Sequence, residues 1–340
     1  MRSSIALTQL LLKGTLANMA SEAIVDLIKV PTEAGTHFPG QSKAPDAVIE
    51  AAWLRQKLQD IGFDTRVHEP LRTSAAAIRA ATWHPAPKVN GVRNESDALQ
   101  VMQTVRRYLV LGGDGLQDTF PVFIGGDCSI TPAILAGLWQ CYPEHTQVGL
   151  LYIDGDVDLT LPSQTSVEGS SGILDSMTLT HLTGRVGGLD SMRGFTRPNG
   201  KPLIDPDNIV LFGFDPLQSS SEAWTYLLEH QFKAYSRPTV QKGSVQCMKA
   251  ALGWLRQRVD VILVHFDLDV VDSGEIPLAN YPHYAGLTAD QAFAALEEAL
   301  ECEQVRGLIV TEINPSNDPD GQMVERVVDA IVRGMSRRLQ

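Results

Sequence analysis

The sequence predicts an α/β fold in which helices cover both faces of a mainly parallel sheet. Apolar runs of strand length recur along the 340 residues, and stretches with helical periodicity separate them. Such alternation is typical of parallel strands joined by crossover helices. Ligands bind beyond the carboxyl ends of the strands in these sheets, so the residues after each apolar run are the first candidates for a functional site.

Nine apolar runs have the length and the flanking turn residues expected of strands. The runs at 147–154 and 260–269 are apolar almost throughout, which is typical of strands buried on both faces of a parallel sheet. The predicted strands are 23–30, 64–69, 107–113, 121–127, 147–154, 208–214, 232–236, 260–269 and 305–315.

Five stretches between these runs carry the spacing of amphipathic helices. One of them has a helix-start signal, because Thr288 is a candidate N-cap and Gln291 stands three residues later. The predicted helices are 44–60, 131–141, 221–230, 244–258 and 288–303.

No Pro-, Gly- or Ser-rich linker divides the chain, so residues 23–340 are interpreted as a single domain and residues 1–22 as an N-terminal extension. The first 21 residues contain Arg2 and Lys13 but no acidic residue. Short targeting segments share this pattern with ordinary helices or tails, and the second interpretation is favoured.

The composition excludes several classes of protein. A net charge of −12 argues against a nucleic-acid partner, because phosphate backbones are bound through an excess of Lys and Arg. No apolar run reaches the roughly 18 to 20 residues that a membrane span needs. The four cysteines (Cys128, Cys141, Cys247, Cys302) show no CxxC spacing, which indicates neither a zinc knuckle nor a disulfide framework. We therefore expect a soluble protein of a reducing, cytoplasmic compartment.

Two of the predicted strands end in aspartates. Asp154, Asp156 and Asp158 belong to the first cluster, and Asp267 and Asp269 to the second. Alternate residues of an extended strand point the same way, so each cluster is expected to present its carboxylates on one face. A single aspartate would be interpreted as a turn residue, but five crowded carboxylates repel unless a cation lies among them. Oxygen ligands of this kind favour Mn²⁺, Mg²⁺ or Ca²⁺.

Four short blocks at predicted strand ends resemble motifs of the ureohydrolase family, which includes arginases and agmatinases. The family blocks are GGDHS, DAHxD, SFDxDxxDP and ExNP. The blocks of this chain are GGDCS (125–129), DGDVD (154–158), FDLDVVD (266–272) and TEINP (311–315). The resemblance extends to AGLT (285–288) and SSGILDSM (170–177), and covers residue 23 to the C-terminus.

The resemblance implies a three-layer α/β/α domain with an eight-stranded parallel sheet. It also implies a two-metal site, usually of Mn²⁺, where a bridging hydroxide attacks the carbon of a guanidinium or amidine. A small cationic substrate and a homo-oligomer are implied as well, because family members often form trimers or hexamers. The ligand positions fall on Cys128, Asp154, Asp156, Asp158, Asp267 and Asp269, with Asp154 and Asp267 bridging.

Two further carboxylates take positions with known roles in the family. Glu312 matches the carboxylate that anchors the guanidinium, which suits a planar cation with paired N–H donors. Asp175 replaces the histidine that moves protons in arginases. A proton-transfer role is predicted for Asp175, with a solvated loop acid as the alternative.

Both histidine ligands of the family are replaced, by Cys128 and Asp156. The family ligands carry four negative charges, whereas a thiolate and an added carboxylate would make six. A metal pair neutralised to that extent lowers the pKa of its bridging water less, and a thiolate fits Zn²⁺ or Fe²⁺ better than Mn²⁺. Mn²⁺ is predicted by resemblance. Zn²⁺, Fe²⁺, Mg²⁺, a single ion, no ion, and a protonated or merely buried Cys128 are the alternatives.

Substrate recognition also departs from the arginase pattern. Thr160 and Ile173 stand where arginases have asparagines, Ser171 remains, and Tyr281 replaces a small threonine. Losing hydrogen-bonding groups and gaining bulk disfavours free arginine. The predicted substrate-binding residues are Ser171, Thr160, Tyr281 and Glu312, and the predicted substrate is another guanidino, amidino or formimino compound.

Three histidines near the predicted site have more than one interpretation. His265 precedes Asp267 on the same strand and is a ligand or base, or, as favoured here, a satisfied core histidine. His181 and His283 are candidates to replace the missing proton-shuttling histidine.

The preferred hypothesis is a metal-dependent hydrolase of a C–N bond. The alternative is a catalytically silent or non-hydrolytic protein of the same fold that has lost the two-manganese centre.

Overall fold

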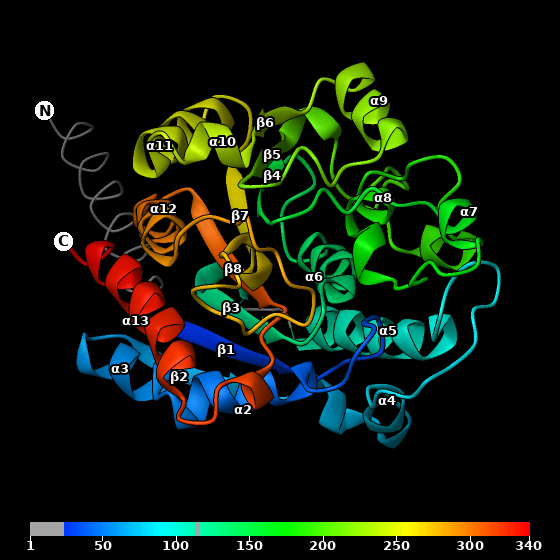
Figure 1. Cartoon of the computed structure of the whole chain (residues 1–340). Coiled ribbons are helices and arrows are strands. Elements are labelled where there is room, and N and C mark those ends of the chain that lie inside the picture. The colour runs from blue at the N-terminus through cyan, green and yellow to red at the C-terminus, as the bar shows by residue number, and fades with distance from the viewer. Residues whose placement is uncertain (1–23, 113–115) are drawn as a thin grey trace, which may run out of the picture.

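An eight-stranded sheet forms the centre of the molecule (Figure 1), and every pairing between its strands is parallel. The computed structural model describes residues 24–112 and 116–340. The strand order is β2-β1-β3-β8-β7-β4-β5-β6. The strands are β1 (Ile24–Val30), β2 (Asp64–His68), β3 (Phe120–Gly125), β4 (Val148–Ile153), β5 (Ile209–Phe212), β6 (Lys233–Tyr235), β7 (Val261–Asp267) and β8 (Val305–Thr311). The predicted α/β architecture is confirmed.

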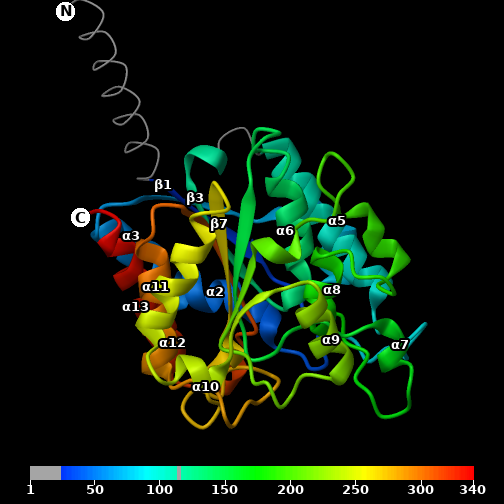
Figure 2. The same ribbon diagram turned by 90° about the horizontal axis from the view of Figure 1, so that it is seen from above.

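Helices cover both faces of the sheet, as Figure 2 shows. One face carries α2 (Ala44–Asp46), α3 (Leu54–Asp60), α11 (Ser244–Leu255), α12 (Ala289–Glu301) and α13 (Gln322–Arg337). The other carries α4 (Ala75–Ala80), α5 (Glu95–Gly112), α6 (Thr131–Leu138), α8 (Thr178–Leu182) and α9 (Ser221–Glu229). The remaining short helices are α7 (Pro162–Thr165) and α10 (Arg237–Val240).

Side-chain alternation along the strands divides the core into two apolar layers. On β1, Val25 and Leu27 pack into the layer beneath α12 and α13, while Ile28 and Val30 pack beneath α5. Central strands such as β3 and β4 are buried along their whole length. Continuous apolar strands are therefore a direct consequence of burial on both faces.

The predicted strand at 107–113 is wrong, because its described residues form the end of α5. Val110 and Leu111 are 44% and 79% exposed, so the apolar run does not mark a buried strand. The residues of α5 that reach the core instead follow helical spacing: Ala98, Val101, Met102, Val105 and Leu109.

The predicted helix at 44–60 is interrupted. A π-helical turn at Ala47–Ala51 follows α2, and Trp53 adopts a left-handed φ of 65° before α3 begins. That conformation turns the chain between the two helices. The predicted start of α12 is confirmed: Gln291 N–H donates to Thr288 Oγ1, and Thr288 N–H donates to Gln291 Oε1, both at 3.2 Å.

The N-terminal extension at 1–22 lies outside the described residues, and the assignment of 23–340 to one domain stays a prediction. Among the helices that the structure describes, none combines the length and the apolar character that a bilayer crossing requires.

Gly126, just after β3, lies against the backbone of the neighbouring strand end. A Cβ atom at this position would fall 1.5 Å from the carbonyl oxygen of Thr32. We expect Gly126→Ala to lower the free energy of unfolding by about 2 kcal/mol or more, because backbone must move. Chemical denaturation measures this change.

Gly253→Ala is the matched control. Gly253 is exposed on α11, and nothing lies within 4 Å of an added Cβ. This change should stabilise the protein by about 0.5 to 1 kcal/mol through the helix propensity of alanine. Equal stability of Gly126→Ala and the wild type would contradict the close approach.

Candidate metal centre

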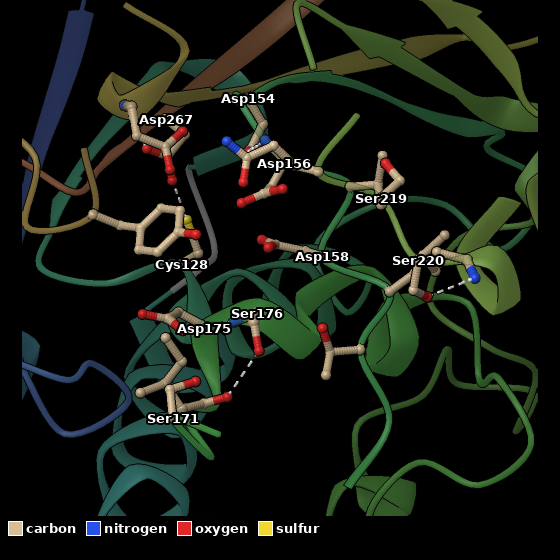
Figure 3. A pocket seen from close by; sticks show the side chains of 18 of the residues that line it. Cys128, Asp154, Asp156, Asp158, Ser171, Asp175, Ser176, Ser219, Ser220 and Asp267 are labelled. Carbon is tan, nitrogen blue, oxygen red and sulfur yellow. Dashed lines mark hydrogen bonds between the residues drawn. The ribbon is translucent and has the colours of Figure 1, made fainter. Parts of the chain in front are cut away.

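The eleven residues predicted for the site line one pocket of about 330 Å³. The pocket opens at the carboxyl ends of β3, β8, β7 and β4, which are adjacent in the sheet. Figure 3 shows Asp154, Asp156 and Asp267 gathered on one side and Asp175 on the other. Their proximity is established, whereas the role of each stays a prediction. They are Cys128, Asp154, Asp156, Asp158, Thr160, Ser171, Asp175, Asp267, Asp269, Tyr281 and Glu312.

Turns, rather than strand alternation, bring the aspartates together. β4 ends at Ile153 and β7 at Asp267, so the expectation that extended strands present the carboxylates on one face is wrong. Asp154 Oδ1 accepts a hydrogen bond from Asp156 N–H (2.6 Å), and Asp267 Oδ1 accepts one from Asp269 N–H (2.8 Å). Aspartate stabilises such turns by bonding the backbone two residues on. The second oxygen of Asp154 has no hydrogen-bond partner in the described residues, and the second oxygen of Asp267 accepts from Cys128 Sγ.

Two site residues hold strained backbone conformations. Asp158 has a φ of 43° and Glu312 a φ of 64°, in the left-handed region that non-glycine residues seldom adopt. Tyr152 Oη donates to Asp158 Oδ2, and Glu312 N–H donates to the carbonyl of Gly126 (2.8 Å). Strain of this kind, about 1 to 3 kcal/mol each, clusters at functional sites.

Cys128 is a buried thiol at the end of β3. Its Sγ donates to Asp267 Oδ2, and burial, followed by the charges of Asp267 and Glu312, raises the pKa of Cys128 well above its usual value. Without a metal, the protonated form is therefore favoured.

His265 has partners on both ring nitrogens. Nδ1 lies 3.1 Å from Thr131 Oγ1 and Nε2 lies 3.3 Å from Thr311 Oγ1, and the ring stacks on Tyr152. Burial lowers the pKa of His265 to about 3. The favoured interpretation of a neutral core histidine fits these contacts.

Glu312 is held at the base of the pocket by two donors. Its Oε1 accepts from Cys128 N–H (3.0 Å), and its Oε2 accepts from the amide of Gln41. Burial, and then the charge of Asp175, raises the pKa of Glu312 well above its usual value. A cationic ligand beside Glu312 would relieve this repulsion.

Asp175 belongs to a 3₁₀ turn (Asp175–Met177) that is tied to the loop after β1. Leu174 N–H donates to the Gly35 carbonyl (2.9 Å), and Ser176 N–H donates to Asp175 Oδ1 (2.6 Å). Burial, followed by Asp127, raises the pKa of Asp175 well above its usual value. The protonated form of Asp175 is therefore favoured over its usual balance.

The walls of the pocket come from loops. Segment 160–202 contributes Thr160, Ser171 and Ile173. Tyr281 is 52% exposed and lies at the mouth.

Sequence analysis missed Gln41 and the polar loop after β5, which supplies Gln218, Ser219 and Ser220. The loop could have been found, because its Ser-rich run follows a predicted strand whose carboxyl end meets the same edge of the sheet.

His283 is a buried histidine that lies beside the aspartates. Its Nε2 lies 3.3 Å from Asp269 Oδ2 and 3.5 Å from Asp156 Oδ2. Burial disfavours the charge, but Asp269 and Asp156 outweigh it and raise the pKa of His283 to about 11. In the same contact burial opposes ionisation of Asp269, yet His283 lowers the pKa of Asp269 below its usual value. Neither Lys nor Arg lines the pocket among residues 24–112 and 116–340.

Two groups of side chains have donor atoms within 4.8 Å of one another, as metal ligands require. The first is Cys128, Asp154, His265 and Asp267, and the second is Asp156, Asp269 and His283. Asp154 Oδ2 and His283 Nε2 are buried and have no hydrogen-bond partner in the described chain. Such atoms are costly unless something binds them. The residues present therefore fit divalent cations.

Comparison with known proteins gives one consistent family. The model of the arginase family matches residues 23–336. An arginase of Staphylococcus aureus is 25% identical over 315 residues, covering 92% of this chain and 97% of the relative.

Solved structures agree in fold. An Entamoeba histolytica arginase in complex with L-ornithine superposes with a TM-score of 0.76 at 18% identity, covering 92% of this chain and 98% of the other. A Trypanosoma cruzi formiminoglutamase with Mn²⁺ gives a TM-score of 0.63 at 18% identity, covering 94% and 95%.

His181 lies on α8 outside the pocket and provides a pH test of the fold. Burial lowers the pKa of His181 to about 4, and its Nε2 accepts a hydrogen bond from Leu189 N–H. The unfolded chain takes up this proton near pH 6.5. We therefore expect the free energy of unfolding to fall by about 1.4 kcal/mol per pH unit from pH 6.5 to 4 through this residue, with no such dependence above pH 6.5.

His181→Gln removes this contribution, so denaturant melts at several pH values should show a shallower fall for the variant. Parallel curves for variant and wild type would contradict the buried neutral histidine.

Proposed function

Because this chain belongs to the arginase family, we propose that it is a divalent-metal-dependent hydrolase that cleaves a C–N bond of a small guanidino, amidino or formimino compound. The observation that carries this proposal is the convergence of six aspartates on one pocket together with the unpartnered, buried Asp154 Oδ2. Buried carboxylates of this density require a counter-cation.

The metal ligands in this proposal are Cys128, Asp154, Asp156, Asp158, Asp267 and Asp269. Mn²⁺ is favoured by the family, and the thiol of Cys128 makes Zn²⁺ or Fe²⁺ the alternative. A divalent ion bound here supplies an acidified water. If two ions bind, Asp154 and Asp267 would be the ligands shared between them, because each uses only one carboxylate oxygen in its turn.

Glu312 binds the cationic end of the substrate. Its carboxylate is 6% exposed and already oriented by Cys128 N–H and Gln41, so a planar cation meets a preorganised acceptor. Asp175 holds or delivers a proton on the side of the pocket away from Asp154 and Asp267, which its raised pKa supports. In this proposal Glu312 therefore binds the substrate, and Asp175 transfers the proton.

The pocket walls disfavour free arginine. Thr160, Ser171 and Tyr281 are the substrate-contacting residues in this proposal, and Ile173 adds an apolar surface. Thr160 and Ile173 stand where arginases have asparagines, so the amino acid end of arginine would lose those particular hydrogen bonds.

A catalytically silent relative is the second candidate. The contact of Cys128 Sγ with Asp267 Oδ2 and that of His283 with Asp269 favour it, since both partly satisfy the acids without an ion.

Metal content separates the two candidates. Protein purified without chelator should contain stoichiometric divalent metal by inductively coupled plasma mass spectrometry. Asp267→Asn should lose most of it, because the amide keeps the turn but removes the charge. Asp260→Asn, at the exposed opposite end of β7, is the control and should retain the metal. If the wild type contains no metal and its melting temperature does not change when Mn²⁺, Zn²⁺ or Fe²⁺ is added, the metal-dependent hydrolase is excluded and the catalytically silent relative remains.

Glu312→Gln tests cation binding. Removing a buried anion that pairs with a substrate cation should lower kcat/KM about 100-fold or more, measured by urea or ammonia release across a panel of guanidino and formimino compounds. Metal content should stay unchanged, because Glu312 is not a proposed ligand. An unaltered kcat/KM would remove Glu312 from substrate binding.

A further inference from the structure

His283 stands on the loop between β7 and α12, and its backbone position is set by a reciprocal pair of hydrogen bonds. Ser273 N–H donates to the His283 carbonyl (2.8 Å), and His283 N–H donates to Ser273 Oγ (3.0 Å). A parallel bridge between Val271 and Leu287 closes the same loop. The loop that carries the imidazole is therefore fixed by hydrogen bonds, and this fixes the position of the imidazole beside the aspartates.

The Nε2 atom of His283 lies at ion-pair distance from two carboxylates without a hydrogen bond of good geometry to either. It is buried without a hydrogen-bond partner in the described part of the chain, and the side chain is 3% exposed. Its distances to Asp269 Oδ2 (3.3 Å) and Asp156 Oδ2 (3.5 Å) exceed the roughly 2.7 to 2.9 Å of a charged hydrogen bond. Two ligands of one ion, each about 2.1 Å from it, lie about 3.0 to 3.5 Å apart.

The carboxylates of Asp269 and Asp156 are also oriented toward a common point with His283. Gly155 N–H donates to Asp269 Oδ1 (3.0 Å), which leaves Oδ2 directed at His283. Asp156 keeps its carboxylate free, since its backbone N–H alone takes part in the turn with Asp154. One nitrogen and two oxygens thus converge from two loops, and all three residues belong to one group of candidate ligands.

We propose that His283 is the nitrogen ligand of a divalent ion shared with Asp156 and Asp269, and that it replaces the histidine which the family carries at position 156. The inference rests on the proposed metal-dependent function. It assigns the missing imidazole to a different loop. A neutral imidazole adds no negative charge to the carboxylate-rich shell, and imidazole suits Zn²⁺, Fe²⁺ and Mn²⁺.

Calorimetric titration of the metal-free full-length protein with Co²⁺ tests this assignment without an activity assay. His283→Gln should weaken one binding step at least 100-fold, more than the loss of an outer-shell partner costs. His181→Gln, which also removes a buried histidine, should bind as the wild type does. The double variant His283→Gln/Asp156→His should recover the step, because the imidazole returns to the ion from position 156.

The outcomes separate this inference from the proposed function. Wild type that binds no Co²⁺ overturns both. Wild type that binds Co²⁺, with His283→Gln binding equally well or more tightly, overturns only the ligand role of His283 and makes it an internal counter-cation. Failure of the double variant to recover binding overturns the relocation of the imidazole.

A second measurement avoids mutation and covers the case in which His283→Gln does not fold. In the wild type labelled with ¹⁵N-histidine and loaded with ¹¹³Cd²⁺, the ring that contacts Tyr281 (5.1 Å between centroids) identifies His283. Scalar coupling of its Nε2 to cadmium is expected. A ring protonated on both nitrogens, without coupling, contradicts the proposal.

Discussion

The repulsion among buried carboxylates is the constraint on which this site depends. Burial and the charges of Asp158 and Asp269 raise the pKa of Asp154 well above its usual value, and Asp267 is raised in the same way by burial and Asp269. Nothing in the packing of the sheet requires acids there, because β3, β8, β7 and β4 are stabilised by apolar layers on both faces. Keeping these acids ionised costs free energy, and a cation bound among them would offset that cost.

Much of the fold could be predicted from sequence, because long buried strands and amphipathic helices leave strong patterns. The failures have physical causes. The run at 107–113 contains consecutive apolar residues, but only spacing over the whole of α5 shows which of them face the core. The C-terminal helix α13 was not predicted although Val324, Val327, Val328 and Ile331 follow helical spacing. The break at Trp53 depends on a left-handed residue that no local pattern marks.

The composition of the site was more predictable than its geometry. Motif positions identified the acids because each follows a strand, and parallel strands bring their carboxyl ends to one edge. The way in which they converge was not predicted, since it depends on side chain-to-backbone turns at Asp154 and Asp267. Contacts of Gln41 and His283 could not be inferred either, because each lies on a loop whose path is set by tertiary packing.

Turns at the strand ends carry the acids, whereas loops form the pocket walls, and this difference has a consequence for how such proteins diversify. Asp154, Asp267 and Asp269 lie within two residues of a strand end, and Asp156 and Asp158 follow in the segment just after β4. The walls around Thr160, Ser171 and Gln218 belong to long connecting segments that do not pair with any strand. Natural variation can therefore lengthen, shorten or recompose the entrance without changing the acids at the strand ends. Changes in the loops around the entrance could in this way let the same fold accept different small molecules, while the acids at the strand ends are kept.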